Sequence, residues 1–215
     1  IPGPNLRSVL KSVLRINSDQ EITREMLASL VDLIAQSREI TNLDGLEHCT
    51  NLTKLYLANN QLIDLNGLAN ANLFNLTELY LNNNQLTDLN GLSKANLPNL
   101  TVLNLANNQL TDLNDLTNAK LPKLTSLHLY DNQLTDLNGL ANANLPKLED
   151  LSLIGNQLND LKGLARIIQQ PELTYLRLWN NLITDLSPLA NVDLSNLAWL
   201  DLNNNQISDI SPIVG

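Results

Sequence analysis

A leucine-spaced motif recurs along most of the chain at a nearly constant interval. Residues 76–86 read L-x-x-L-x-L-x-x-N-x-L, and the same frame occurs six more times. The seven frames begin at Leu52, Leu76, Leu100, Leu124, Leu148, Leu173 and Leu197. Successive starts are 24 residues apart, except for a single interval of 25 residues. Such a period indicates one small structural unit that is stacked many times, because a single unit cannot bury its apolar side alone.

A fixed period of 20–29 residues with this pattern is typical of a leucine-rich repeat solenoid. We therefore predict an α/β fold, a right-handed horseshoe with a parallel concave β-sheet. In the repeat that starts at Leu76, residues 79–81 are the predicted strand and residues 86–99 the convex crossover. The leucines expected to point inward there are Leu76, Leu79, Leu81, Leu86, Leu89, Leu92 and Leu97. Turns in the crossover half are marked by Gly67, Gly91, Gly139 and Gly163.

Two helices are predicted before the repeats. Residues 4–16 carry the apolar stripe of an amphipathic helix at Leu6, Val9, Leu10, Val13 and Leu14. Thr23 is expected to cap a second, short helix that faces the core. We assign residues 1–29 to an N-terminal helical cap and residues 30–215 to about eight repeats in one continuous domain. The last repeat is incomplete at Gly215, so we expect the natural protein to continue beyond it.

Charge and hydropathy exclude several classes of partner. A net charge of -9 and a pI near 4.5 argue against nucleic acid and anionic membranes, which attract basic patches. They favour solubility and a basic or mixed partner. We find no run of 18 apolar residues, so no membrane span is predicted.

The single cysteine, Cys49, excludes an internal disulfide. It falls at the end of a repeat, where a small residue should turn inward, so we predict a buried structural thiol; a reactive thiol is the alternative. His48 and His128 are far apart in the array and Cys49 has no second cysteine, so no zinc spacing is present. We therefore expect neither a metal nor a cofactor.

Two polar columns recur with the leucines. The first column, predicted to be a structural ladder that bonds backbone groups of neighbouring coils, is Asn60, Asn84, Asn108, Asn132, Asn156, Asn181 and Asn205. The second is Asp64, Asp88, Asp112, Asp136, Asp160, Asp185 and Asp209. Each aspartate is expected to turn or cap its convex segment, and a calcium-binding stack is the alternative.

The variable positions lie between the inward leucines and should face the concave side. Six of the seven aromatic residues fall there, and only Phe74 does not. Aromatic residues and arginine dominate binding hot spots, so we predict a ligand site on this face. Its candidate residues are Tyr56, Tyr80, His128, Tyr130, Asp150, Tyr175, Arg177, Trp179, Trp199 and Asp201. The alternative is that the rings pack on one another and stiffen the sheet.

The chain resembles internalin-like bacterial surface proteins over essentially its whole length. The residues that carry the resemblance are the cap and first repeats, at 4–6, 22–23, 27–30, 40–47 and 50–52, and the final repeat at 205–212. Internalins typically use 22-residue repeats, whereas the period here is 24. The resemblance implies a secreted or cell-surface bacterial protein that binds host or neighbour molecules through its concave face, without catalysis.

We therefore predict a non-catalytic module, expected to be monomeric, that binds a protein partner such as a host or cell-surface protein. Glycan binding by the concave aromatic residues is the alternative. A serine-histidine-aspartate site is a third hypothesis, because His128 lies near Ser126, Ser152 and Asp150 on neighbouring strands. Such a triad also needs an oxyanion hole and a sheltered pocket, which an open strand face does not offer.

Overall fold

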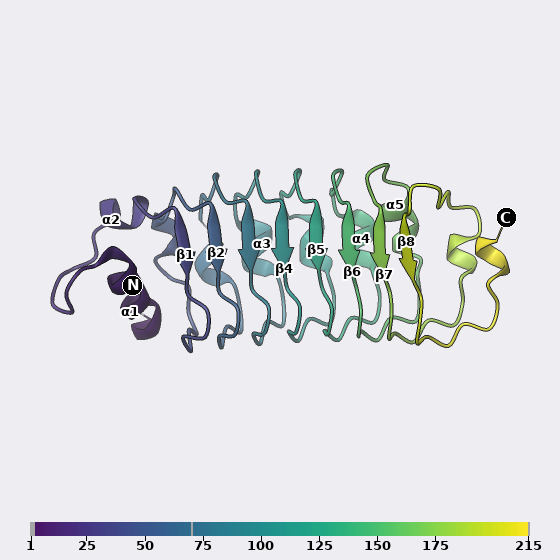
Figure 1. Ribbon diagram of the computed structural model, residues 1–215, viewed down its shortest axis with the longest axis horizontal. Helices are drawn as coiled ribbons and strands as arrows, with labels where there is room; N and C mark the ends of the chain where they lie inside the picture. Colours follow the sequence, from purple (N-terminus) through teal and green to yellow (C-terminus); the bar gives the residue numbers. More distant parts are fainter. Residues whose placement is uncertain (1–2, 70, 215) are drawn as a thin grey trace.

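The computed structural model describes residues 3–69 and 71–214 of the chain. Within these residues, eight short strands form one parallel sheet in which every strand pairs with its neighbours in chain order (Figure 1). The strands are β1 (Asp32–Ile34), β2 (Lys54–Tyr56), β3 (Glu78–Tyr80), β4 (Val102–Asn104), β5 (Ser126–His128), β6 (Asp150–Ser152), β7 (Tyr175–Arg177) and β8 (Trp199–Asp201). The predicted leucine-rich repeat horseshoe is confirmed.

Each crossover returns the chain behind the sheet through a short helical turn. These turns are η1 (Leu46–His48), η2 (Asn66–Leu68), α3 (Asn90–Lys94), η3 (Asn114–Thr117), α4 (Asn138–Asn142), α5 (Leu164–Ile168), η4 (Ser187–Leu189) and η5 (Ser211–Ile213). Figure 1 shows the strands in one row, with α3, α4 and α5 behind them. The short turns fit the 24-residue period, which leaves little length for a longer helix on the convex side.

The register keeps every repeat position opposite its equivalent. Leu55 pairs with Leu79, and Leu79 pairs with Leu103. The middle leucine of each strand from β1 to β7 is fully buried. Most other leucines of the frame are fully buried as well. Burying one such side chain contributes about 1.5–3 kcal/mol, so the stacked leucines are the main stabilising component.

The strand boundaries differ slightly from the prediction. The seven leucines predicted to point inward in the repeat that starts at Leu76 are all buried. The strand itself runs over Glu78–Tyr80 rather than residues 79–81. The backbone ladder still continues to Leu81, whose N–H donates to the Asn104 carbonyl at 2.8 Å. Regular pairing already starts at Glu78, so the strand begins one residue before the predicted start at residue 79.

The asparagine column bonds neighbouring coils to each other. Asn108 is buried, and its amide donates to the carbonyls of Leu81 (3.1 Å) and Leu105 (3.0 Å). Its Oδ1 accepts the Leu86 N–H at 3.0 Å. The other ladder residues, Asn60, Asn84, Asn132, Asn156, Asn181 and Asn205, bond their own and the preceding coil in the same way. Each amide thus satisfies buried backbone groups where the chain leaves the sheet.

The aspartate column closes local turns. Asp88 Oδ1 accepts the Asn90 N–H at 3.0 Å, and Asp136 Oδ1 accepts the Asn138 N–H at 2.9 Å. The same bond to the residue two positions on forms at Asp64, Asp112, Asp160, Asp185 and Asp209. Within the described residues, no group of three histidine, cysteine or acidic side chains is arranged to hold a metal ion.

Crossover glycines mark places where two coils touch. A Cβ on Gly91 would lie 1.9 Å from the Leu65 carbonyl oxygen, and one on Gly139 would lie 2.0 Å from that of Leu113. Neither glycine has the positive φ of a left-handed turn. The sequence interpretation of these residues as turn markers is therefore incomplete, because here glycine allows close packing of successive coils.

Two helices precede the sheet at the N-terminal end (Figure 1). Helix α1 (Pro4–Leu14) buries Leu6, Val9 and Leu10, and helix α2 (Arg24–Ala28) is capped by Thr23, whose hydroxyl accepts the Met26 N–H. Val13 departs from the predicted apolar stripe, since it is 40% exposed. Leu14 in the same turn still packs against the core, whereas Val13 lines an open groove with Ile34.

The assignment of residues 1–29 as a cap and residues 30–215 as repeats remains a proposal. Ile1, Pro2 and Gly215, where these two regions begin and end, lie outside the described residues. Among residues 3–69 and 71–214, no helix has the length and apolar content needed to cross a membrane.

The asparagine ladder gives a testable prediction for stability. Asn108→Ala leaves three carbonyls and one N–H without the amide partner, so we expect the free energy of unfolding to fall by about 2 kcal/mol. Urea unfolding followed by circular dichroism measures this change. Asn118→Ala is the matched control, because Asn118 is exposed and should cost less than about 0.5 kcal/mol. Equal losses in the two variants would contradict a structural role for the ladder.

Cys49 gives a second prediction. Its side chain is fully buried, and burial, followed by the nearby Glu47 charge, raises the pKa of the thiol to about 12. Only the thiolate is nucleophilic, so we expect iodoacetamide to leave the folded protein unlabelled at about pH 8 and to label it fully in urea. Mass spectrometry counts the adduct. Labelling of the folded protein at the rate of a free thiol would favour the reactive alternative.

Candidate functional site

The strands present one row of side chains to the leucine core and two rows to the opposite side of the sheet, where most are at least partly exposed but Asn104 and Ser152 are buried. Successive side chains of a strand point to opposite sides, so the middle leucine points inward and its two neighbours point outward. We call the solvent side the strand face. It consists of the first and third residues of each strand, together with the residue two positions beyond the strand. In leucine-rich repeat solenoids this side is the concave one.

The aromatic residues are unequally exposed on the strand face. Tyr175 is 43% exposed, Trp179 45% and Trp199 55%. Tyr56, Tyr80 and Tyr130 are half-buried. Phe74, the remaining aromatic residue, is 53% exposed but lies in the crossover between η2 and β3. The largest accessible rings of the strand face therefore gather around β7 and β8.

Tyr56 and Tyr80 form an internally bonded set on β2 and β3. Their rings stack with centroids 4.9 Å apart. Glu78 accepts a hydrogen bond from the Tyr56 hydroxyl at 2.7 Å and pairs with Lys54 at 2.8 Å. The bond from Lys54, followed by that from Tyr56, lowers the pKa of Glu78, and the same bonds raise the pKa of both donors. The polar groups of this set are thus largely satisfied within the chain.

Asp150 links the middle of the strand face to β7. Its carboxylate accepts a hydrogen bond from Arg177 Nη1, and His128 Nε2 lies 3.9 Å away on the other side. Burial alone would raise the pKa of Asp150, but His128 and Arg177 outweigh it, so this pKa lies below its ordinary value. Tyr130 lies beside His128, with ring centroids 6.5 Å apart. The predicted residues of β5, β6 and β7 therefore form one connected group.

The most exposed group lies on β7 and β8. Tyr175 pairs with Trp199 across the two strands, and Arg177 pairs with Asp201. The Arg177 guanidinium carbon lies 5.5 Å from the centroid of the Tyr175 ring, within the range of a cation–π contact. Trp179 follows on the same face. We call Tyr175, Trp179, Trp199 and Asp201 the C-terminal cluster.

The ten predicted site residues therefore fall into two groups. Tyr56 and Tyr80 stand apart on β2 and β3, because β4, which carries no predicted site residue, separates them from β5. The other eight occupy β5 to β8 or the residues just beyond these strands. Sequence reasoning missed Leu182, which is 44% exposed close to Trp179 in the chain. The available signal was a break in a column, since other repeats have glutamine at this position, as at Gln157 and Gln206.

The serine-histidine-aspartate hypothesis finds little geometric support. Asp150 is near His128, but no hydrogen bond of the described residues joins His128 to Ser126 or Ser152. Ser152 is buried, whereas a nucleophile has to meet its substrate. The side chains of the strand face are thus arranged as a surface and not around a reacting atom.

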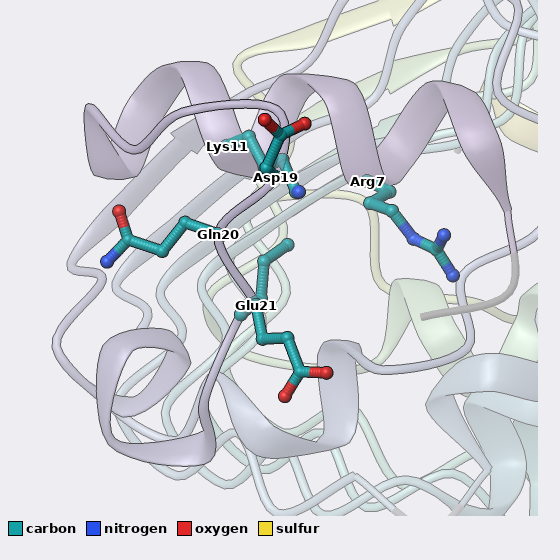
Figure 2. A pocket seen from close by; sticks show the side chains of 6 residues that line it. Arg7, Lys11, Asp19, Gln20 and Glu21 are labelled. Atoms are coloured by element: carbon teal, nitrogen blue, oxygen red, sulfur yellow. The ribbon is translucent and has the colours of Figure 1, made fainter.

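A separate hollow of about 320 Å³ lies between α1 and residues 19–22 of the N-terminal segment. Its lining includes Arg7, Lys11, Asp19, Gln20 and Glu21. Figure 2 shows Arg7, Gln20 and Glu21 pointing in different directions instead of converging on one point. Lys11 donates to the Ser18 carbonyl, which ties the loop to the helix. The hollow therefore lacks a set of groups that would hold a single ligand.

Comparison with known families identifies the repeats. A family model described as leucine-rich repeats in two copies matches residues 29–70 and 75–118. A second, described as leucine rich repeat, matches residues 98–158 and 171–214. A comparison with curated protein sequences gives no match. The leucine-rich repeat fold is in general a scaffold for protein interaction.

Solved structures give closer relatives. Internalin C2 of Listeria monocytogenes is 34% identical to this chain, with a TM-score of 0.80. The match covers 100% of this chain and 89% of the internalin C2 chain. The internalin inlF of the same organism is 33% identical, with a TM-score of 0.65, and the match covers 99% of this chain and 72% of the inlF chain. The functional domain of InlJ, also from Listeria monocytogenes, is 28% identical, with a TM-score of 0.66, and the match covers 97% of this chain and 47% of the InlJ chain. The chain therefore belongs to the internalin family of bacterial leucine-rich repeat proteins.

Proposed function

We propose that this internalin-family chain is a non-catalytic recognition module that binds a protein partner on the strand face. The single observation that carries the proposal is the exposure of three large rings at one end of the strand face, with Tyr175 and Trp199 paired across β7 and β8 and Trp179 two residues beyond β7. The leucine core is complete without these rings, so folding alone does not account for their positions. Large aromatic side chains are the usual anchors of protein interfaces.

Rigidity supports the same proposal. Every strand from β1 to β8 is bonded in register to its neighbours, and the asparagine ladder fixes the bends that follow the strands. The strand face is therefore preorganised, and little conformational entropy is lost when a partner binds. Tyr56 and Tyr80 would act as a secondary contact, because their rings stack on each other and the Tyr56 hydroxyl already bonds Glu78.

Membership of the internalin family supports a proposal for location and partner class. We propose that the protein is secreted or displayed on a bacterial cell surface, acts as a monomer and binds a host or cell-surface protein. Glycan binding remains the alternative, since exposed indoles beside Asp201 and Asn203 could also stack on a sugar and hydrogen-bond it. The two proposals differ in whether these residues bind a protein or a sugar.

The binding proposal predicts a loss of affinity when the indoles are removed. We expect the Trp179→Ala/Trp199→Ala double variant to bind its partner with at least about 2 kcal/mol less free energy, roughly thirtyfold in Kd. A partner is first captured from candidate host-cell extracts with the parent protein, and its Kd for each variant is then measured by surface plasmon resonance.

Phe74→Ala is the matched control, because it removes an equally exposed aromatic ring from outside the strand face. Its Kd should match that of the parent protein. Unchanged affinity in the double tryptophan variant would exclude the C-terminal cluster as the site. Glycan-array hits that disappear in the double variant, with no captured protein that depends on the indoles, would favour the sugar alternative.

A further inference from the structure

We infer that the partner of the C-terminal cluster contributes a basic side chain, arginine or lysine, that stacks on an exposed indole and pairs with Asp201. This inference rests on the proposed function and specifies the chemistry of the partner. It is carried by the neighbourhood of Asp201, by the engagement of Arg177 elsewhere and by the charge of the last repeats.

Asp201 lies among the exposed rings. It is two residues beyond Trp199 on β8, so both side chains are on the strand face. Arg177 is the cross-strand partner of Asp201. Tyr175 lies two residues before Arg177 and Trp179 two residues after it. Two residues along a strand span about 6.6 Å and neighbouring strands lie about 4.8 Å apart, so these diagonal neighbours are about 8 Å apart, within reach of aromatic side chains. A partner group held against the rings would therefore also lie beside the Asp201 carboxylate.

One oxygen of this carboxylate is open to a partner. Asp201 Oδ1 accepts the Asn203 N–H at 3.1 Å and the Asn203 side-chain amide at 2.7 Å. Within residues 3–69 and 71–214, no hydrogen bond reaches Asp201 Oδ2 and no cation lies within ion-pair distance of the carboxylate. Asp201 therefore presents one carboxylate oxygen to a partner on the strand face.

The nearest candidate cation of the chain is engaged elsewhere. Arg177 is the residue opposite Asp201, yet its guanidinium bonds Asp150 on β6 and lies over the Tyr175 ring. Asp150 also has His128 close by. Glu78, another carboxylate of the strand face, is similarly paired with Lys54. Among these three carboxylates, Asp201 is the one that lacks a cation and has indoles beside it.

The surrounding charge favours a basic group as well. Residues 171–214 contain Glu172, Asp185, Asp193, Asp201 and Asp209 but a single basic residue, Arg177. This imbalance attracts a cationic partner and disfavours an acidic one. Indoles offer the strongest aromatic surface for a cation, and an exposed ion pair with a carboxylate adds to that attraction. The two effects act on the same side chain of the partner.

The experiment compares two peptides that differ only in charge. The first contains three arginines spaced by glycine and serine, and the second has citrulline, a neutral group of nearly the same shape, at each arginine position. Fluorescence polarisation of labelled peptides gives both Kd values. Trp179 and Trp199 are the two tryptophans of the chain, so a change in tryptophan fluorescence reports binding at the cluster. We expect the arginine peptide to bind about fivefold tighter to the parent protein.

Asp201→Asn tests the carboxylate. The amide oxygen still accepts from Asn203, so the fold is retained while the charge is removed, and we expect the preference for arginine to fall close to one. Asp193→Asn is the matched control. Asp193 Oδ1 accepts the Ser195 N–H in the same kind of turn, but this residue lies between η4 and β8, outside the strands, and its replacement should leave the preference intact.

Equal affinity for the two peptides, failure of the parent protein to bind either, or a preference that survives Asp201→Asn would each overturn the inference. The proposed function is tested separately by capture of a partner. If capture depends on Trp179 and Trp199 but the arginine preference is absent, the recognition site stands and only the basic side chain of the partner is excluded. Retained capture by the double tryptophan variant would instead contradict the site itself.

Discussion

The stacking of leucines between successive coils is the interaction on which the rest of the structure depends. Each coil is too thin to bury its own side chains, so Leu79 is covered only because Leu55 and Leu103 lie directly beside it in the sheet. The asparagine ladder makes this stacking possible at the bends, where Asn108 bonds buried backbone groups of two coils. Hydrophobic burial and backbone satisfaction are therefore combined in the same 24-residue unit.

This construction separates stability from recognition. The core uses the middle residue of each strand and the leucines of the crossover, and it makes no demand on the strand face apart from β-compatible side chains. The outward positions can consequently differ from repeat to repeat, from the paired Lys54 and Glu78 to the exposed Trp179 and Trp199. A rigid array of this kind presents different chemistry along its length without any change of fold.

The repeat period made the fold, the strand register and the buried leucines predictable, because stacking forces equivalent positions into columns. Contacts that depend on side-chain direction were not predictable in this way. The register alone places Arg177 opposite Asp201, but the guanidinium turns to Asp150, and this choice becomes visible only when all three strands are placed. Close packing at Gly91 was also hidden, since a sequence pattern does not distinguish a turn glycine from one that touches a backbone. Whether the predicted residues bind a partner remains a prediction.

The most direct test of this account is the stability of a variant whose largest exposed rings are removed together. Tyr175→Ser/Trp179→Ser/Trp199→Ser replaces the aromatic part of the C-terminal cluster and leaves the leucine core unchanged. If the leucines and the asparagine ladder hold the solenoid alone, the free energy of unfolding in urea should change by less than about 1.5 kcal/mol, the sum of three surface substitutions. A loss of about 5 kcal/mol or more, the size of large truncations in a core, would show that these rings belong to the fold and would contradict the account.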